Sequence, residues 1–420
     1  MEMVKKIKSF FSGDKLSSIQ IFICVLFPVA ILYCFNPAFS YLSQSTDAHI
    51  AWCMVGFSSL YLVTRSVLIS WNKKRKDFEN IETEGRYTGI DLLRCLAVMM
   101  VIILHDLIAI GYYEEPSGTS RFFVLSLLRW WCMSSCPLFM MMSGYLLNKR
   151  DMTCSHYTKL FKILRNYFSI VIMFFLIHRG SFSIERLKDF INFDSLWYMN
   201  MYFGLFLLVP YLNRLYLSLK KHESTVLIGI LLFLSSLWTI TDNWTTSYWS
   251  ALYPILYFFI GRYIRENKIH VRKITAVSVV CLMVFGMSTY SQYINYGASF
   301  SWTDNFGGYS SGYNAFPVVV TSTACFLLLY DIRLKSSWVT RIISEISSVS
   351  LEIYLISALV TGESVRHFFW SLSLPVGRSW QMLLVAPCEL LASFVCGKLI
   401  NCFWLKAKGV WTSLKSGAQG

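Results

Sequence analysis

Charge is scarce in this sequence. Only 15% of its 420 residues are Asp, Glu, Lys or Arg, whereas a soluble domain carries about 25%. Hydrophobic residues make up 55% of the chain, so too few polar side chains are present to cover its surface in water. This composition excludes an ordinary soluble domain. It predicts an all-α polytopic membrane protein, because helices satisfy their own backbone polar groups in lipid.

Metal-ligand and disulfide patterns are also missing. The cysteines lie mostly inside apolar runs, with no C-x-x-C pair and no Cys/His spacing typical of zinc. We therefore predict neither a disulfide framework nor a metal, and no bound cofactor. Acidic residues are few as well, 24 against 38 Lys and Arg, which gives a formal net charge of +14. That excess fits nucleic-acid binding in a soluble protein, but the cytoplasmic loops of membrane proteins also collect Lys and Arg.

Apolar runs near the length of about 20 residues that a membrane span needs recur along the chain. We predict about twelve spans, of which the first is a retained helix rather than a cleaved signal. They lie near 19–42, 50–71, 90–111, 122–147, 161–177, 196–213, 225–240, 248–264, 274–291, 316–330, 339–360 and 380–404.

The distribution of basic residues tests this topology. Segments assigned to the inside carry 28 Lys and Arg, and those assigned to the outside carry 6. The bias predicts that both termini are cytoplasmic, and it accounts for the basic charge without nucleic acid. The charge-rich linker 72–89 follows the second span. We therefore expect a two-helix extension over 1–85, a ten-helix membrane domain over 86–405 and a cytoplasmic tail over 406–420.

The third predicted span contains ionisable side chains, which are costly in a membrane and so indicate function. Arg94 and His105 are 11 residues apart, which places both on one helix face with a rise of about 16 Å. Arg94 could bind phosphate or carboxylate, and a neutral His105 could remove a proton from a hydroxyl group. The alternatives are a structural histidine and an arginine that reaches the membrane surface. Asp106 is expected to reach the outer surface rather than to orient His105.

Several ordered motifs give the chain a resemblance to a known family. Gly89-Ile-Asp91-Leu-Leu-Arg94 through His105 resembles the opening signature of the acyltransferase-3 family of integral membrane transacylases, in which an Arg is followed by ten residues and a His. Further blocks agree in order: Pro137 through Ser143-Gly144-Tyr145; Lys162-Ile-Leu-Arg165; Leu196-Trp197-Tyr198 with Gly204 through Pro210; Tyr257 through Gly261; and Ser350 through Ile356. Together they cover about 86–405.

This resemblance implies an O-acyltransferase that moves an acyl group, usually acetyl, from cytoplasmic acyl-CoA to a glycan or glycolipid hydroxyl. It implies His105 as the base and Arg94 as its paired residue, which places the donor. Lys162 and Arg165 could add attraction for the CoA phosphates, although positive-inside retention explains them equally well. The expected partners are acyl-CoA, a glycan or lipid-linked oligosaccharide, and membrane lipid. The expected location is the bacterial inner membrane.

Four further residues are substrate-pocket candidates: Ser143, Trp197, Tyr198 and Glu352. The sequence has no G-x-S-x-G context, which argues against an acyl-serine at Ser143. Glu352 lies within a span, so it must be protonated or paired with a cation such as Arg94 or Arg129. We expect a structural ion pair there more than a catalytic role.

The sequence departs from the family pattern at Ser357, where many members carry a second histidine. The favoured reaction is acetylation of a cell-envelope glycan such as O-antigen polysaccharide of lipopolysaccharide, through His105 alone. The alternative functions are a glycan or glycolipid transporter and a structural partner of a glycan-assembly complex. A transporter is disfavoured because the chain shows no matching pair of Gly/Pro-interrupted halves.

Overall fold

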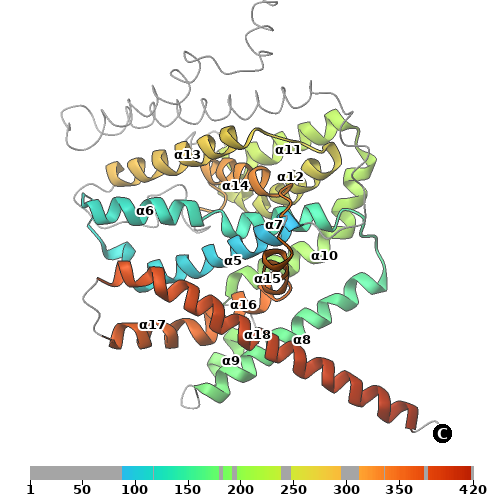
Figure 1. Ribbon diagram of the computed structural model, residues 1–420. Helices are drawn as coiled ribbons and strands as arrows, with labels where there is room; N and C mark the ends of the chain where they lie inside the picture. The colour runs from blue at the N-terminus through green and yellow to red at the C-terminus, as the bar shows by residue number, and fades with distance from the viewer. Residues whose placement is uncertain are drawn as a thin grey trace, which may run out of the picture. The chain divides into compact units, whose positions relative to one another are not determined.

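The computed structural model describes residues 88–116, 118–178, 183–191, 196–237, 247–294, 312–334, 336–372 and 377–417, and these are helical throughout, joined by turns (Figure 1). The α-helices are α5 (Thr88–Ala109), α6 (Ser120–Cys132), α7 (Ser135–Leu146), α8 (Cys154–Ile177), α9 (Ile184–Ile191), α10 (Trp197–Ser218), α11 (Lys221–Ser235), α12 (Tyr253–Asn267), α13 (Lys273–Ile294), α14 (Phe316–Leu329), α15 (Ser337–Ser347), α16 (Ser350–Ile356), α17 (Gly362–Ser371) and α18 (Arg378–Gly417). Short 3-10 helices are η4 (Tyr112–Glu114) and η8 (Ser247–Leu252), and η9 (Ser357–Thr361) is a π-helical turn. An all-α fold is confirmed for the described residues.

The chain forms two compact units, and α5 begins in the first and continues into the second. In the first unit, α7 lies against α12 and α14, and α13 lies against α6 and α14. Two glycines make the α7–α12 contact close. A Cβ at Gly144 would lie 1.9 Å from the Phe258 carbonyl oxygen, and a Cβ at Gly261 would lie 2.0 Å from that of Met141. Two of the family-like sequence blocks therefore meet here, because only glycine lets these helix backbones approach.

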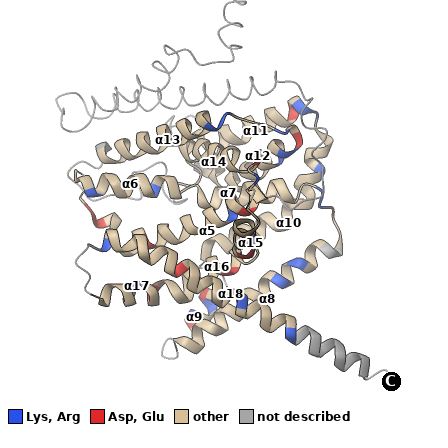
Figure 2. Ribbon diagram, viewed as in Figure 1, with Lys and Arg blue, Asp and Glu red and all other residues tan. Residues whose placement is uncertain are grey.

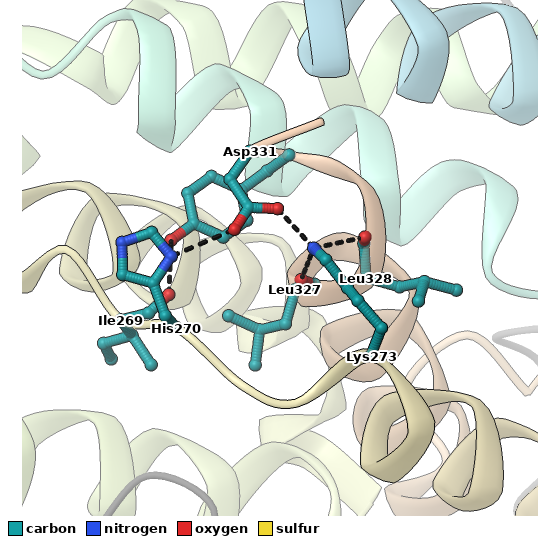
Figure 3. Close-up of polar contacts among 7 residues, drawn as sticks. Ile269, His270, Lys273, Leu327, Leu328 and Asp331 are labelled. Carbon is teal, nitrogen blue, oxygen red and sulfur yellow. Dashed lines mark hydrogen bonds and ion pairs between the residues drawn. The ribbon is translucent and has the colours of Figure 1, made fainter. Parts of the chain in front are cut away.

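Two loops of the first unit are joined by a polar cluster (Figure 3). His270 Nδ1 lies 3.0 Å from Asp331 Oδ2, and Lys273 donates to the carboxylate of Asp331 and to the carbonyl oxygens of Leu327 and Leu328 at the end of α14. Burial alone would raise the pKa of Asp331, but the hydrogen bonds from His270 and Lys273 outweigh it and lower that pKa. The predicted inside segment 262–273 thus contacts Asp331, the first residue of the predicted inside segment 331–341.

The second unit contains most of α5, with α8, α9, α15, α16, α17 and α18 and the greater part of α10. Here α16 lies against α8 and α18, while α17 lies against α18. The π turn η9 contacts both α8 and α18 and connects α16 to α17 without a loop. A π turn adds a residue to the helical turn, so it changes the direction of the side chains that follow.

The count of twelve spans is not confirmed. Among the described residues, five helices are long and apolar enough to cross a membrane, or six if the α15–α16 pair, bent by 55°, is one span. Helices α11, α12 and α14 have only 15, 15 and 14 residues. Hydropathy alone does not decide the number of spans, because a helix buried inside the protein is as apolar as one in lipid. In α14, for example, eleven residues from Phe316 to Leu327 are buried.

The predicted domain boundaries lie at 85 and 405. The predicted spans 19–42 and 50–71, and hence the two-helix extension over 1–85, lie outside the described residues. At the other end, α18 continues to Gly417, so the last helix runs well past the predicted end of the span at 404. The predicted division at 85 and 405 stays a prediction.

Candidate active site

Helix α5 carries both residues of the Arg/His motif. Its 22 residues form one continuous helix that includes Arg94 and His105. Eleven residues in an α-helix correspond to about three turns and a rise of about 16 Å. The two side chains are therefore held at opposite ends of one rigid element and near the same face. The structure thus places both residues on one helix, as the 11-residue spacing predicted.

Arg94 lies where α5 meets α15. Its Nη1 donates a hydrogen bond to Ser347 Oγ at 3.3 Å, and the neighbouring Cys95 thiol donates to the Ile343 carbonyl oxygen. The guanidinium also acts electrostatically on the phenol of Tyr202 in α10. Arg94 is half-buried, so it is held in place by neighbours and still partly accessible. A guanidinium in this setting suits the recognition of a phosphate or carboxylate.

Glu352 has amide partners rather than the predicted cation. Asn166 Nδ2 donates to Glu352 Oε1 at 2.6 Å, and Asn401 Nδ2 lies 3.4 Å from the same oxygen. Asn166 in turn accepts hydrogen bonds through Oδ1 from Arg165, at 2.9 Å and 3.3 Å. The expected direct ion pair with Arg94 is therefore wrong, because asparagine side chains occupy the space around the carboxylate. The guanidinium of Arg165 reaches Glu352 only through Asn166.

Arg165 and Lys162 lie on successive turns of α8. The guanidinium of Arg165 stacks on the Trp404 ring, 4.6 Å from its centre, so this arginine is positioned by α18. Lys162 is exposed. Figure 2 shows Lys and Arg in the first half of α8, which includes Lys159, and none in its second half. The first half of α8 is therefore basic, whereas its second half carries no Lys or Arg.

The aromatic pair Trp197–Tyr198 begins α10. Tyr198 is buried, and its ring meets the edge of the Tyr354 ring with 5.3 Å between centres. Trp197 is 42% exposed and contacts Tyr198 edge to face. Tyr198 thus packs against the α16 helix that carries Glu352, whereas Trp197 keeps an accessible face.

Ser143 lies in the first unit, on α7. Its hydroxyl donates to the Phe139 carbonyl oxygen at 2.9 Å, four residues earlier in the same helix. The helix continues without a break through Ser143 to Leu146. The next residue, Gly144, is the one at the close contact with α12, whereas the Ser143 hydroxyl is engaged within its own helix.

The surroundings of His105 contain charged residues that sequence analysis missed. Asp106 is 1% exposed, and its Oδ1 accepts a hydrogen bond from Arg366 Nη1 at 3.1 Å. The same nitrogen lies 3.5 Å from Oε2 of Glu389, which is fully buried. Arg366 is also the charged group that acts on the His105 imidazole. The prediction that Asp106 reaches the outer surface is therefore wrong, because Arg366 of α17 and Glu389 of α18 enclose it.

A signal for one of these residues was present in the sequence. Glu389 lies within the apolar run 380–404, so the rule that selected Glu352 as an ionisable residue in a span selects it too. Arg366 gave no such signal, since it lies in a segment assigned to an outer loop. It belongs instead to α17, a helix that the hydropathy analysis did not predict.

Comparison with known proteins agrees with the sequence motifs. Residues 87–401 match the model of a family described as an acyltransferase domain, the acyltransferase-3 family. The match covers α5 through most of α18 and therefore includes every candidate site residue. No curated protein and no solved structure matches the chain. The chain belongs to the acyltransferase-3 family and is a membrane acyltransferase.

Proposed function

We propose that this acyltransferase moves an acetyl group from cytoplasmic acetyl-CoA to a hydroxyl of a cell-envelope glycan, such as O-antigen polysaccharide, in the bacterial inner membrane. The observation that carries the proposal is the position of Arg94 and His105 on the single helix α5. A separation of about 16 Å along the helix is of the order of an extended pantetheine arm. A donor whose anionic end is bound near Arg94 then presents its thioester near His105.

In the proposed reaction His105 acts as a general base. Its unprotonated imidazole nitrogen takes the proton from the acceptor hydroxyl while that oxygen attacks the thioester carbonyl carbon. The tetrahedral intermediate collapses, the carbon–sulfur bond breaks, and the CoA thiolate leaves. The imidazolium then returns the proton to the thiolate. The products are an acetyl ester and CoA, and the base is regenerated.

The donor-binding role is assigned to three cations. Arg94 would hold the CoA phosphates or pantetheine, and Lys162 and Arg165 would attract the phosphates from the surface of α8. The support is that Lys162 is exposed and that Arg165 is fixed by Trp404 and Asn166. Oriented guanidinium groups bind phosphates through paired hydrogen bonds.

The acceptor pocket is assigned to the residues around α10 and α16. The accessible ring of Trp197 suits stacking on a sugar, and buried Tyr198 packs against that ring edge to face. Glu352 would stay structural, since its oxygen is engaged by Asn166. Ser143 stays the weakest of the pocket candidates, because its hydroxyl is used within α7.

The test compares envelope glycans from cells that express wild type, His105→Ala, Arg94→Ala or no copy. The matched control is His222→Ala, which removes an exposed histidine on α11. Mass spectrometry and proton NMR measure acetyl ester, with membrane levels of each variant matched. We expect acetyl ester with wild type and His222→Ala only. Equal acetylation by His105→Ala would remove His105 as the base, and glycans without acetyl ester in every strain would overturn the proposed activity.

The acyl group is tested separately. Membranes that contain wild type are supplied with radiolabelled acetyl-CoA in the presence of excess unlabelled succinyl-CoA or acetyl-CoA. We expect unlabelled acetyl-CoA to suppress incorporation strongly and succinyl-CoA to suppress it weakly. The reverse order would assign a different acyl donor to the same site.

A further inference from the structure

A cluster of buried charged residues lies beside His105 in the second unit. It consists of Asp106 on α5, Arg366 on α17 and Glu389 on α18. Arg366 Nη1 contacts both carboxylates, at 3.1 Å for Asp106 and 3.5 Å for Glu389. Asp106 is 1% exposed and Glu389 is fully buried, whereas the Arg366 side chain keeps 16% of its surface accessible. Nη1 of the guanidinium thus faces both acids, while part of the Arg366 side chain remains accessible.

The burial of this cluster costs folding free energy. Burial of charged groups costs several kcal/mol each, and apolar side chains of similar volume commonly stabilise a fold as well or better. Three carboxylate oxygens, Asp106 Oδ2 and both oxygens of Glu389, accept no hydrogen bond from an N–H group of the residues that the structure describes, and the two carboxyl groups interact with each other. Stability alone therefore does not explain why two acids and a guanidinium are gathered here.

A π turn and a glycine shape the backbone beside the cluster. The π turn η9 precedes α17 and ends at Thr361, directly before Gly362. A Cβ at Gly362 would lie 2.8 Å from Glu389 Oε1 and 3.0 Å from Arg366 Nη1. The absence of a side chain at this position leaves the space in which Glu389 and Arg366 meet. π turns within helices are frequent at functional sites.

Arg366 has hydrogen-bond donors left over for a substrate. A guanidinium carries five N–H donors in a rigid fork, and Nη1 is the nitrogen that contacts the two carboxylates. Nε and Nη2 make no hydrogen bond to any described residue. The positive charge of Arg366 also interacts with the imidazole of His105, the proposed base.

The chemistry beside His105 needs such a group. When the acceptor oxygen attacks the thioester, the carbonyl oxygen gains negative charge in the tetrahedral intermediate. Oriented donors aimed at that oxygen are the largest single contribution in many acyl-transfer enzymes. Arg94 lies about three helical turns from His105 and cannot supply them there.

We propose that Arg366 is a second catalytic residue, whose guanidinium stabilises the oxyanion formed beside His105, and that Asp106 and Glu389 are positioning residues that hold it. This inference rests on the proposed acyl transfer through His105. It adds an electrophilic partner to the base: one side chain removes the proton and another stabilises the charge on the reacting carbonyl. The bonds that form and break are those given above.

The test measures initial rates in inside-out membrane vesicles, which contain the enzyme and the host's own envelope glycans, supplied with radiolabelled acetyl-CoA. Arg366→Gln is expected to lower kcat about 10²–10³-fold, as does the loss of one oxyanion donor, with little change in the KM for acetyl-CoA. The matched control is Arg378→Gln. Arg378 is an exposed arginine at the start of α18, and it stacks on Trp370 of α17. This variant should keep the wild-type kcat. Wild-type kcat in correctly folded Arg366→Gln would overturn the inference.

Chemical rescue separates catalysis from folding. Added guanidinium or methylguanidinium at low millimolar concentration should restore part of the activity of Arg366→Ala and none of the activity of His105→Ala. Loss of Arg366 leaves two buried acids, so a second variant, Arg366→Ala with Asp106→Asn and Glu389→Gln, keeps the site neutral. It should be folded and inactive. An active triple variant would refute the role of Arg366.

Positioning by the acids gives a different signature. Glu389→Gln keeps the shape of the side chain but weakens its hold on Arg366, so kcat should fall less than in Arg366→Gln. If wild type itself transfers no acetyl group in these vesicles, the proposed function fails. If wild type is active and Arg366→Gln is equally active, only the role of Arg366 fails.

Discussion

The crossing of α7 and α12 allows a prediction worked directly from the geometry. In Gly144→Ala the new Cβ would lie 1.9 Å from the Phe258 carbonyl oxygen and 2.7 Å from its carbon. Real Cβ atoms essentially never approach closer than 3.0 Å, so a movement of about 1 Å is required in a close-packed interior. The obstacle is backbone, which cannot rotate away as a side chain can. The two helices must therefore separate.

The expected cost follows from overpacking. Extra atoms in a well-packed core destabilise by about 1–3 kcal/mol, and alanine recovers up to about 1 kcal/mol through its helix propensity. With the full recovery by alanine, a net loss of up to about 2 kcal/mol remains. The matched control is Gly229→Ala in α11, where an added Cβ meets nothing within 4 Å. That change should leave stability unchanged or raise it slightly.

Buried thiols of the same unit report the unfolding. Cys132, Cys136 and Cys325 are buried, so a thiol-reactive fluorogenic dye labels them only when the unit opens. Thermal scans in one detergent should place Gly144→Ala below wild type and Gly229→Ala at or above it, while exposed thiols set the starting signal. If Gly144→Ala unfolds at the same temperature as Gly229→Ala, the close approach of these helices is refuted.

The other predictions concern charge. Glu352→Ala should destabilise by about 1–3 kcal/mol because it takes the acceptor from the buried Asn166 amide and from the half-buried Asn401 amide. Glu352→Gln, which keeps an oxygen, should recover part of that loss in the same thermal scan. The pKa of Asp331 is lowered on folding. Its ion pairs therefore stabilise the fold fully above the unfolded pKa of about 4 and lose this effect as the pH falls through the folded pKa. In Asp331→Asn, the free energy of unfolding should depend less on pH at acid pH. Lys162→Ala and Arg165→Ala should each raise the KM for acetyl-CoA with kcat nearly constant, and the difference from wild type should shrink at high salt. A fall in kcat at constant KM would place either cation at the reacting group instead.

The sequence was informative where the physics is local. Helix α5 was predicted within two residues at each end, since an apolar run with helical spacing needs no partner to be recognised. The same local signal placed Arg94 and His105 on one helix. It did not decide the number of spans, because hydropathy is the same for a helix in lipid and for one buried in protein, such as α14.

The polar partners of buried side chains could not be predicted from the sequence, for a different reason. Glu352 was expected to meet a cation, yet Asn166 and Asn401 surround it, and neither amide carries a sequence signal that marks it as a partner. Tertiary packing decides which of several distant side chains reaches a buried carboxylate. The residues that complete the charge network can be named only when α8, α16 and α18 are seen together.

The sequence by itself determined the class of the protein, its helical composition and the helix that carries Arg94 and His105, since composition and periodicity act over short stretches of chain. Only the tertiary structure decided what surrounds His105. Asp106 and Arg366 are 260 residues apart in the chain, and they meet because the π turn η9 and Gly362 direct α17 toward α5 and α18. Contacts between such distant residues depend on the packing of whole helices, which no local pattern records.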